Sequence, residues 1–404
     1  MNIMLVSLVA LENLDSQNIY ADLLKTFISH GHNVAAITPR ERRTGLPTAV
    51  EVSHGITLLH VSIGNVTKNG PIEKGWSLLR LQRDFMKAID ANLDDFEPDL
   101  IIYATPPTTI AGLIASLKKR YNAKTYLLLK DFFPQNSVDL GMMRAKGPMS
   151  LLYRYFKRTE RDTYKAADYI GCMSEANRNY LFEHEPWIDC ARVEVNPNSI
   201  IPSNRLMLSA TEKAQLRTKY GVPANSKLIV YGGNLGKPQA IDVLIDALKL
   251  NEEKYVCHFL VCGDGTEREK LEGYFESYSP RHATLLSSLP VHEFNSMLCM
   301  ADAGLILLDC RFTIPNFPSR VLSYMQAALP VVVAADNSTD MGVIAESEGF
   351  GVYGSSECGE SLLSTCERLF DSDLLLMGTR GRKFLERNYC SEISYTTIVR
   401  HFSE

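Results

Sequence analysis

The sequence predicts an α/β protein with two domains, each built on a parallel sheet. Residues 3–38 follow the order strand, loop, helix, strand, which is the βαβ unit of a parallel sheet. The same alternation begins again near Leu228 and continues to Val333. The length of 404 residues exceeds what one ordinary hydrophobic core accommodates. Together these observations favour two domains over one.

The composition is that of a soluble globular protein, with 45% hydrophobic and 22% charged residues. The net charge of −5 argues against extended nucleic-acid binding. The 9 cysteines occur without a CxxC pair or a cluster with histidine, which predicts reduced cytosolic thiols and no zinc site. The N-terminus lacks the pattern of a signal peptide, and no apolar run is long enough to span a bilayer. Any membrane contact is therefore expected to be peripheral.

In the N-terminal half, short buried runs alternate with hydrophobic residues at helical spacing. The expected strands span residues 3–8, 34–38, 55–61, 100–103, 125–129 and 169–173, and the helices span 19–30, 76–93, 110–120 and 148–165. Gly31 ends the first helix. The loop after the first strand lacks the G-x-G-x-x-G pattern, which disfavours a dinucleotide oxidoreductase.

Polar side chains follow two of these strands at the sheet edge where open α/β folds bind ligands. Glu12, Asn13, Asp15 and Ser16 follow the first strand, and Asp131 follows the strand at 125–129. Asp15 and Asp131 are the candidates for acid–base chemistry. Solvated loop residues and helix caps have the same composition, so the residues alone leave that interpretation open as well.

The segment from Asp131 to Lys165 combines an aromatic and methionine-rich loop with an amphipathic helix. The loop carries Phe132, Phe133, Met142 and Met143, one helix face carries Met149, Leu152, Tyr153 and Phe156, and another face carries Arg154, Lys157, Arg158, Arg161 and Lys165. A basic amphipathic helix beside an apolar loop suits the surface of an anionic membrane. A helix that only covers a sheet has the same pattern, so both interpretations remain.

The second domain repeats the alternation with glycine, polar or basic residues at the strand ends. The expected strands span 228–231, 256–261, 283–286, 305–308 and 331–333. Gly233 and Asn234 lie in a glycine-rich turn in which Lys237 can reach a phosphate, and Gly263 and Gly265 lie in a second turn. Leu289 lies in the turn after the third strand.

The stretch from Asp309 to Val333 is expected to form a loop, a helix and a buried strand. Pro318 stands where the helix begins, and Ser319 is expected to cap it. A helix N-terminus with Arg320 and Arg311 nearby suits a diphosphate. An ordinary capped helix that binds no ligand has the same sequence pattern, so both interpretations remain.

The domain boundary is expected near Asn198, with domains 1–198 and 199–388 and a C-terminal segment 389–404 that crosses back to the first domain. The D-x-D sequence formed by Asp371 and Asp373 lies between two helical stretches, so we interpret it as a helix cap rather than a metal site.

Three motifs of the second domain resemble the nucleotide-sugar domain of family 4 glycosyltransferases. They are Gly-Gly-Asn-Leu-Gly-Lys-Pro-Gln (232–239), Cys-Gly-Asp-Gly (262–265) and Pro-Ser-Arg-x-x-x-Tyr-Met (318–325). The likeness continues in the first domain through residues 30–34 and 131–142, which are similar to the L-fucosamine-transferase-like subgroup of capsule and O-antigen gene clusters. It covers essentially the whole chain.

The resemblance implies a GT-B fold, with two Rossmann-like domains facing a central cleft, the acceptor in the first and the donor in the second. It implies a transfer that retains anomeric configuration and needs no metal and no cofactor other than the donor substrate, a UDP-sugar. Helix-end amides and basic side chains would stabilise the departing diphosphate, in agreement with the residues at the strand ends.

Two departures from the family pattern concern the donor site. Pro315 and Ser323 occupy the positions of two glutamates that contact the donor, and Asn234 and Gln239 replace an arginine and a lysine. The resemblance and the strand ends together give a predicted donor site of Gly233, Asn234, Lys237, Gly263, Gly265, Leu289, Arg311, Pro318, Ser319, Arg320 and Ser323. Asp131 aligns near a position where family members place a histidine, which makes it a candidate base.

The expected function is transfer of a sugar, an N-acetylated amino or deoxy sugar, from a UDP donor to a polyprenyl-diphosphate-linked saccharide of a surface polysaccharide. The expected location is the cytoplasm, with peripheral attachment to the inner face of the cell membrane and no nucleic-acid partner. Two alternatives are a UDP-sugar 2-epimerase of the same fold and a non-catalytic nucleotide-sugar-binding partner subunit. The epimerase would need no acceptor, and the partner subunit would bind UDP without turnover.

Overall fold

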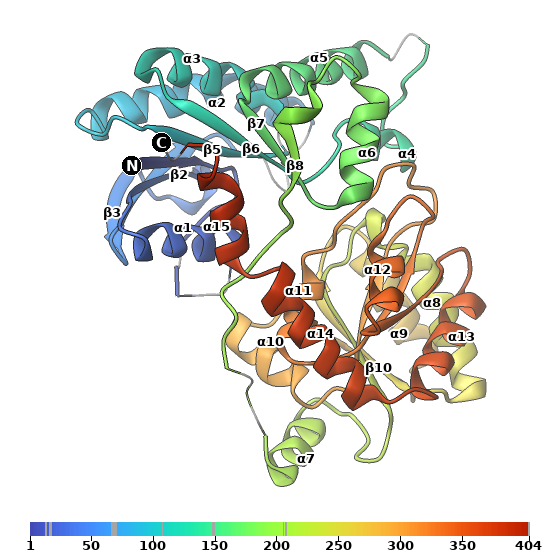
Figure 1. The fold of residues 1–404 in the computed structure, drawn as a ribbon. Coiled ribbons are helices and arrows are strands. Elements are labelled where there is room, and N and C mark those ends of the chain that lie inside the picture. Colours follow the sequence, from blue (N-terminus) through green and yellow to red (C-terminus); the bar gives the residue numbers. More distant parts are fainter. Residues whose placement is uncertain are drawn as a thin grey trace. The chain divides into compact units, whose positions relative to one another are not determined.

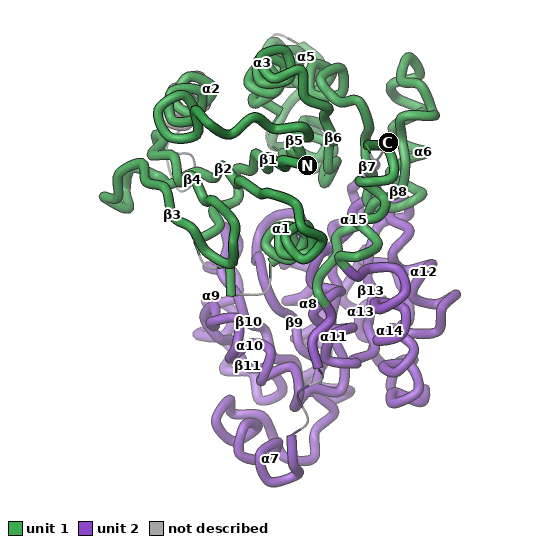
Figure 2. The backbone as a smooth tube through the Cα atoms, turned by 60° about the vertical axis from the view of Figure 1, so that its left-hand side comes forward, with its two compact units in different colours: residues 1–201, 391–404 green, residues 202–390 purple. Residues whose placement is uncertain are grey.

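The computed structural model describes residues 1–12, 14–15, 18–65, 71–106, 108–147, 150–204, 206 and 208–402, with only the backbone for residues 71–79. The chain divides into two compact units (Figure 2). Unit 1 comprises Met1–Ile201 and Ser391–Glu404, and unit 2 comprises Pro202–Cys390. The division after Ile201 falls three residues beyond the boundary expected at Asn198.

Across its described residues, unit 1 forms an eight-stranded sheet in the order β3-β4-β2-β1-β5-β6-β7-β8. Its strands are β1 (Asn2–Val6), β2 (Asn33–Glu41), β3 (Ala49–Ser53), β4 (Ile56–Ile63), β5 (Leu100–Thr105), β6 (Lys124–Leu129), β7 (Tyr169–Cys172) and β8 (Val193–Val195). Its helices are α1 (Ile19–Ser29), α2 (Pro71–Asn92), α3 (Ala111–Tyr121), α4 (Gln135–Asp139), α5 (Ser150–Ala166), α6 (Glu175–His184) and α15 (Ser391–Val399), with 3-10 turns at Arg42–Thr44, Thr108–Ile110 and Cys190–Arg192.

Helices α2, α3 and α5 lie on one side of this sheet and α1 and α15 on the other (Figure 1). Asn18 caps α1 by accepting a hydrogen bond from the Tyr20 N–H, and Gly31 follows the helix in the left-handed conformation (φ 77°). The C-terminal α15 is fastened to the same unit: the Ser391 N–H donates to the Ile200 carbonyl at 2.9 Å, and the Thr26 hydroxyl donates to the Ser391 hydroxyl at 2.7 Å.

Within the described part of unit 2, a six-stranded parallel sheet has the order β11-β10-β9-β12-β13-β14. Its strands are β9 (Leu228–Asn234), β10 (His258–Asp264), β11 (Ala283–Leu286), β12 (Ala303–Leu307), β13 (Val331–Ala335) and β14 (Gly351–Ser355). Its helices are α7 (Ala210–Lys219), α8 (Ile241–Lys254), α9 (Arg268–Tyr278), α10 (Val291–Leu298), α11 (Arg320–Gln326), α12 (Met341–Ser347), α13 (Gly359–Phe370) and α14 (Leu374–Asn388), with a 3-10 turn, η4, at Lys237–Gln239. Helices α8, α9 and α13 contribute to one buried cluster on the sheet.

The predicted fold class is confirmed, because both units are α/β and their strands are parallel with one exception. The exception is β3, which pairs antiparallel with β4 at the edge of unit 1. The sequence also failed to predict α4, α12 and β14. They are short, and elements of five to seven residues carry too little periodicity to stand out.

The D-x-D sequence is a helix cap, as predicted. Asp373 precedes α14, and its carboxylate accepts a hydrogen bond from the Leu376 N–H at 3.0 Å. Among the described helices, none has the length and apolar character needed to cross a membrane.

Candidate functional site

The carboxyl ends of β9 and β10 lie side by side in unit 2, with Gly263 opposite Gly233 and Asp264 opposite Asn234. The Leu235 N–H donates to the Asp264 carbonyl at 2.8 Å. A Cβ added at Gly263 would lie 1.9 Å from the Gly233 carbonyl oxygen, and one at Gly265 would lie 2.4 Å from the Leu235 carbonyl oxygen. Gly263 and Gly265 are therefore required for the close approach of the two chain segments, and their contact with a ligand stays a prediction.

Two arginines reach this edge of the sheet: Arg268, whose guanidinium donates to the Gly263 and Leu286 carbonyls, and Arg320. The guanidinium carbon of Arg320 lies 4.4 Å from the centroid of the Tyr231 ring, in a cation–π contact. A Cβ at Gly233, which has a φ of 116°, would lie 3.9 Å from the same guanidinium carbon. The Nη1 atom of Arg320 is buried and has no hydrogen-bond partner among the described residues. A buried guanidinium nitrogen without a partner is costly unless a ligand accepts its hydrogen bond.

The helix that begins at Arg320 offers fewer free backbone N–H groups to an anion than the sequence predicted. Helix α11 has 7 residues, and Ser319 adopts a helical conformation without a side-chain cap to any described residue. The prediction that Ser319 caps this helix is therefore wrong. The N–H groups of Val321 and Leu322 donate to the carbonyls of Pro318 and Ser319, at 3.2 and 3.1 Å, so the first turn uses these amides itself.

Two tyrosines form hydrogen bonds with the backbone at the carboxyl end of β9. Sequence reasoning did not assign them a role. The Tyr324 hydroxyl accepts a hydrogen bond from the Gly232 N–H at 3.1 Å and donates to the Leu305 carbonyl at 3.2 Å. The Tyr231 hydroxyl donates to the Asn234 carbonyl at 2.8 Å. Tyr324 stands in the Pro-Ser-Arg-x-x-x-Tyr motif, and this motif is the signal by which the sequence could have identified it.

Arg311 is not the free cation that the sequence suggested. Its guanidinium donates twice to the Asp309 carboxylate, at 2.8 and 2.6 Å, and its N–H donates to the same group at 3.0 Å. This bidentate pair neutralises the arginine charge and lowers the pKa of Asp309, against the effect of burial. The charge of Arg311 is therefore offset within the protein and is not free for a ligand.

The remaining predicted donor residues have varied surroundings. Lys237 is exposed at the start of η4 and forms no ion pair with the described part of the chain. The Asn234 amide donates to the Gln239 side chain at 3.0 Å, so each of these two side chains restrains the other.

Ser323 lies one helical turn after Arg320, on the same side of α11. The Leu289 N–H is directed at the Cys262 thiol, which lowers the pKa of that thiol against the larger effect of burial.

Asp131 is the second residue after β6, at the carboxyl edge of the sheet of unit 1. Its Oδ2 accepts a hydrogen bond from the Asn136 amide at 2.5 Å, while its Oδ1 is buried without a partner in the described ranges. Burial raises the pKa of Asp131 to about 6; hydrogen bonds from the Phe132 N–H and Asn136 oppose this shift, and the nearby Glu160 carboxyl adds to it. A carboxyl with this pKa exchanges protons near neutral pH.

Replacing Asp131 with asparagine should stabilise unit 1 above pH 6. The pKa of the folded carboxyl lies above its ordinary value of 3.8, so its contribution to stability is complete below about pH 4 and is lost as the pH rises through 6. Asp131→Asn removes that loss, which is about 1–3 kcal/mol. Thermal unfolding of both proteins at pH 4.5, 6 and 7.5 measures it, with Asp94→Asn at an exposed carboxyl as the control. If Asp131→Asn raised the unfolding temperature by the same amount at every pH, the raised pKa of Asp131 would be contradicted.

Asp15, the second predicted catalytic residue, is not brought together with Asp131. Its carboxylate is exposed and pairs with His54 at 2.7 Å. His54 precedes β4, whose first residue Ile56 pairs with Val34 near the amino end of β2, so this pair lies toward the opposite sheet edge. Asn13 and Ser16 lie outside the described residues.

The predicted apolar loop is mostly packed inside unit 1. Phe132 is 2% exposed and lies 4.6 Å from the Tyr180 ring, while Phe133 packs edge-on against Phe156 of α5 at 4.9 Å. Met143 is half-buried and Met142 is 53% exposed. Phe132 and Phe133 are therefore core and packing residues, which corrects their assignment to a membrane or acceptor surface; Met149 lies outside the described residues.

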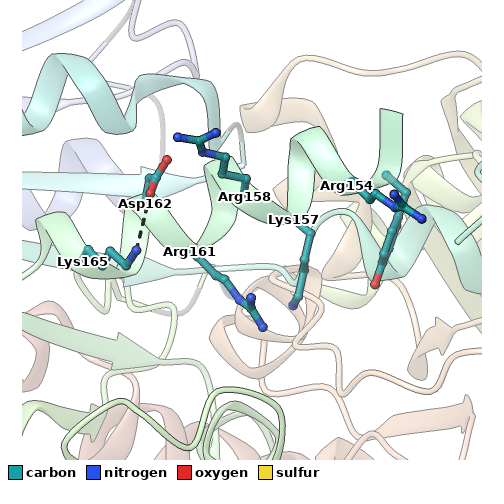
Figure 3. Close-up of a pocket in the computed structure, with 7 residues that line it drawn as sticks. Arg154, Lys157, Arg158, Arg161, Asp162 and Lys165 are labelled. Atoms are coloured by element: carbon teal, nitrogen blue, oxygen red, sulfur yellow. Dashed lines mark ion pairs between the residues drawn. The ribbon is translucent and has the colours of Figure 1, made fainter. Parts of the chain in front are cut away.

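The five cations of the predicted basic face of α5 are drawn in Figure 3, and they differ in their ion pairs. Lys157 pairs with the Glu160 carboxylate at 2.6 Å and with the Glu185 carboxylate at 3.1 Å, and Arg161 pairs with Glu185 at 2.9 Å. Arg154 and Arg158 form no ion pair with any described residue and are exposed. Lys165 lies 3.9 Å from the Asp162 carboxylate, so within the described chain Arg154 and Arg158 are the cations of this face that no carboxylate offsets.

Two family models match the chain. Residues 17–204 match the model of Glycosyltransferase Family 4, and residues 212–357 match the model of Glycosyl transferases group 1. The first match lies almost entirely in unit 1 and the second lies in unit 2.

The chain is similar to a curated relative and to solved structures. WcaI of Escherichia coli K12, assigned to colanic acid biosynthesis as a glycosyl transferase, is 23% identical over 311 residues, which are 76% of this chain and 73% of WcaI. The solved sucrose-phosphate synthase (tll1590) from Thermosynechococcus elongatus has a TM-score of 0.78 at 15% identity, covering 100% of this chain and 98% of that one. Anabaena Alr3699/HepE in complex with UDP-glucose has a TM-score of 0.67 at 13% identity, covering 99% of each chain.

The two structural neighbours have the GT-B fold, and at these identities the likeness shows the fold alone. The family models span most of the chain and place one glycosyltransferase domain in each half. The chain therefore belongs to the GT-B glycosyltransferases, with a family 4 domain followed by a group 1 domain.

Proposed function

We propose that this glycosyltransferase moves a sugar from a UDP-sugar to a polyprenyl-diphosphate-linked saccharide of a surface polysaccharide. The observation that carries the donor side is Arg320, whose buried Nη1 lacks a partner among the described residues and whose guanidinium lies on Tyr231 beside the Gly233 turn. A planar guanidinium with unused N–H groups is suited to two phosphate oxygens.

The choice of UDP and of surface polysaccharide rests on similarity. HepE binds UDP-glucose, and WcaI is assigned to colanic acid biosynthesis. The motifs at 30–34 and 131–142 resemble the L-fucosamine-transferase-like subgroup, which favours an N-acetylated amino or deoxy sugar. The acceptor of such enzymes is lipid-linked, so we place the protein at the inner face of the cell membrane.

In the proposed reaction, the bond between the anomeric carbon and the UDP oxygen breaks and a bond to the acceptor hydroxyl oxygen forms. Negative charge develops on the diphosphate as it leaves, and Arg320 stabilises that charge because it is held in place before the reaction. The acceptor hydroxyl gives up its proton, for which Asp131 is the candidate base, since a pKa of about 6 leaves it largely ionised at neutral pH. The anomeric configuration is retained, and neither a metal nor a cofactor takes part.

Calorimetric titration of the full chain with UDP, GDP, ADP and NAD tests the donor side. We expect selective binding of UDP, followed by transfer from a UDP-sugar when a polyprenyl-diphosphate-linked saccharide is added. Selective binding of another nucleotide would overturn the choice of UDP. Conversion of the UDP-sugar without acceptor would identify an epimerase, and UDP binding without any turnover would identify a partner subunit.

A further inference from the structure

The outer face of α5 combines exposed apolar side chains with cations. Leu151, Leu152 and Tyr155 are 71%, 55% and 46% exposed, which is unusual for large apolar residues of one helix. Leu151, Arg154, Tyr155 and Arg158 recur at spacings of three and four, so they share one side of the helix. The opposite side is buried in unit 1 through Glu160, Thr163 and Tyr164, so the outer side faces away from the core, with Tyr155 at its border beside α3.

A buried carboxylate network fixes this orientation. Glu185, whose side chain is 1% exposed, pairs with both Lys157 and Arg161 and accepts a hydrogen bond from the Trp187 indole at 2.6 Å. Glu160, whose side chain is 3% exposed, also pairs with Lys157 and accepts a hydrogen bond from the Tyr164 hydroxyl at 2.8 Å. These contacts tie α5 to the segment that follows α6, so Lys157 and Arg161 act as anchors of the helix.

The charge that remains on the outer face is positive. Arg154 and Arg158 have no carboxylate partner in the part of the chain that the structure describes, and Lys165 is offset by Asp162 at 3.9 Å. A shallow groove of about 430 Å³ runs along the helix past Arg154, Arg158 and Arg161 (Figure 3). Arginine side chains beside a groove of this kind suit phosphate groups, which they bind through two parallel hydrogen bonds.

We propose that the outer face of α5 docks on an anionic lipid bilayer, with Arg154 and Arg158 on lipid phosphates and Leu151, Leu152 and Tyr155 in the interface. Charge complementarity selects this partner, because cations interspersed with large apolar side chains match phosphates that lie directly above acyl chains. The surface deepens the proposed function, on which it rests for the need to reach a lipid-linked acceptor.

Flotation of the full chain with vesicles of phosphatidylcholine alone, or with a quarter of phosphatidylglycerol, tests this surface. We expect binding only to the anionic vesicles, and a decrease of binding at 0.5 M salt, a concentration at which the Debye length falls to about 4 Å. Each basic residue at such a surface contributes about fivefold in partitioning, so Arg154→Glu with Arg158→Glu should reduce it at least about 25-fold. Leu151→Ser with Leu152→Ser should reduce it at both salt concentrations, because burial of apolar surface does not depend on salt.

The matched control is Lys249→Glu with Lys383→Glu, which makes the same charge change at exposed positions of α8 and α14 in unit 2. It should float like the unmodified protein. Lys157 and Arg161 are left intact, because their substitution would break the Glu185 network and mix folding with binding. Retained flotation of the Arg154→Glu, Arg158→Glu protein, or an equal loss in the control, would overturn the proposal.

A titration with UDP separates this proposal from the proposed function. The Arg154→Glu, Arg158→Glu protein should bind UDP as the unmodified protein does, since both changes lie in unit 1. If UDP failed to bind any of these proteins while flotation followed the expected pattern, the donor assignment would fall and the lipid surface would stand.

Discussion

Replacing Arg320 with alanine should weaken UDP binding about 10- to 150-fold, which corresponds to about 1.5–3 kcal/mol. The guanidinium is held against Tyr231 and has a buried nitrogen without a partner in the described chain, so binding needs little reorganisation of this side chain. Its hydrogen bonds to phosphate are charge-assisted. Calorimetric titration of both proteins with UDP measures the change.

Two further variants show whether the effect belongs to the Arg320 side chain. Arg320→Lys should restore only part of the affinity, because one ammonium group cannot present two parallel N–H groups. Arg311→Ala, in the loop that precedes α11, should have a much smaller effect because Arg311 is already paired with Asp309. Equal losses from Arg320→Ala and Arg311→Ala would mean that general positive charge, rather than the Arg320 geometry, decides binding.

Replacing Gly263 with alanine should destabilise unit 2 by about 3 kcal/mol or more and impair UDP binding. The new Cβ would lie 1.9 Å from the Gly233 carbonyl oxygen, which is backbone and cannot move aside without opening the pairing of β9 and β10. The turn that carries Gly233 and faces Arg320 would shift with it. Urea unfolding followed by far-UV circular dichroism measures the stability, and calorimetry measures the binding.

Gly273→Ala is the matched control for the same chemical change. Gly273 lies inside α9, and a Cβ there would meet none of the described atoms within 4 Å. Alanine is favoured over glycine in a helix, so this variant should gain about 0.5–1 kcal/mol. A stability of Gly263→Ala close to that of Gly273→Ala would show that the two chain segments are not packed as described.

Several parts of the fold and of the candidate site could be predicted from the local sequence pattern. The alternation of buried runs with amphipathic stretches predicted the strands β1, β6, β9 and β12 because sequence periodicity reports which faces of an element meet a core. The position of Asp131 after β6 and of Gly233 at the end of β9 followed in the same way, since a parallel sheet brings strand ends to one edge. Short elements such as α4 could not be predicted, because five residues are too few to show a hydrophobic periodicity.

The sequence by itself determined the two-domain α/β plan and the residue types available at each strand end. Only the tertiary structure decided which of those charges are free. Arg311 is neutralised by Asp309, and Arg161 by Glu185, a residue of another segment, whereas Arg320 has a tyrosine face and a buried nitrogen without a partner in the described chain. The physical reason is that a charge acts on a ligand only when no counter-charge lies beside it. For Arg311 the counter-charge is two residues away in the sequence and depends on the loop conformation, whereas the surroundings of Arg161 and Arg320 come from packing between residues distant in the sequence.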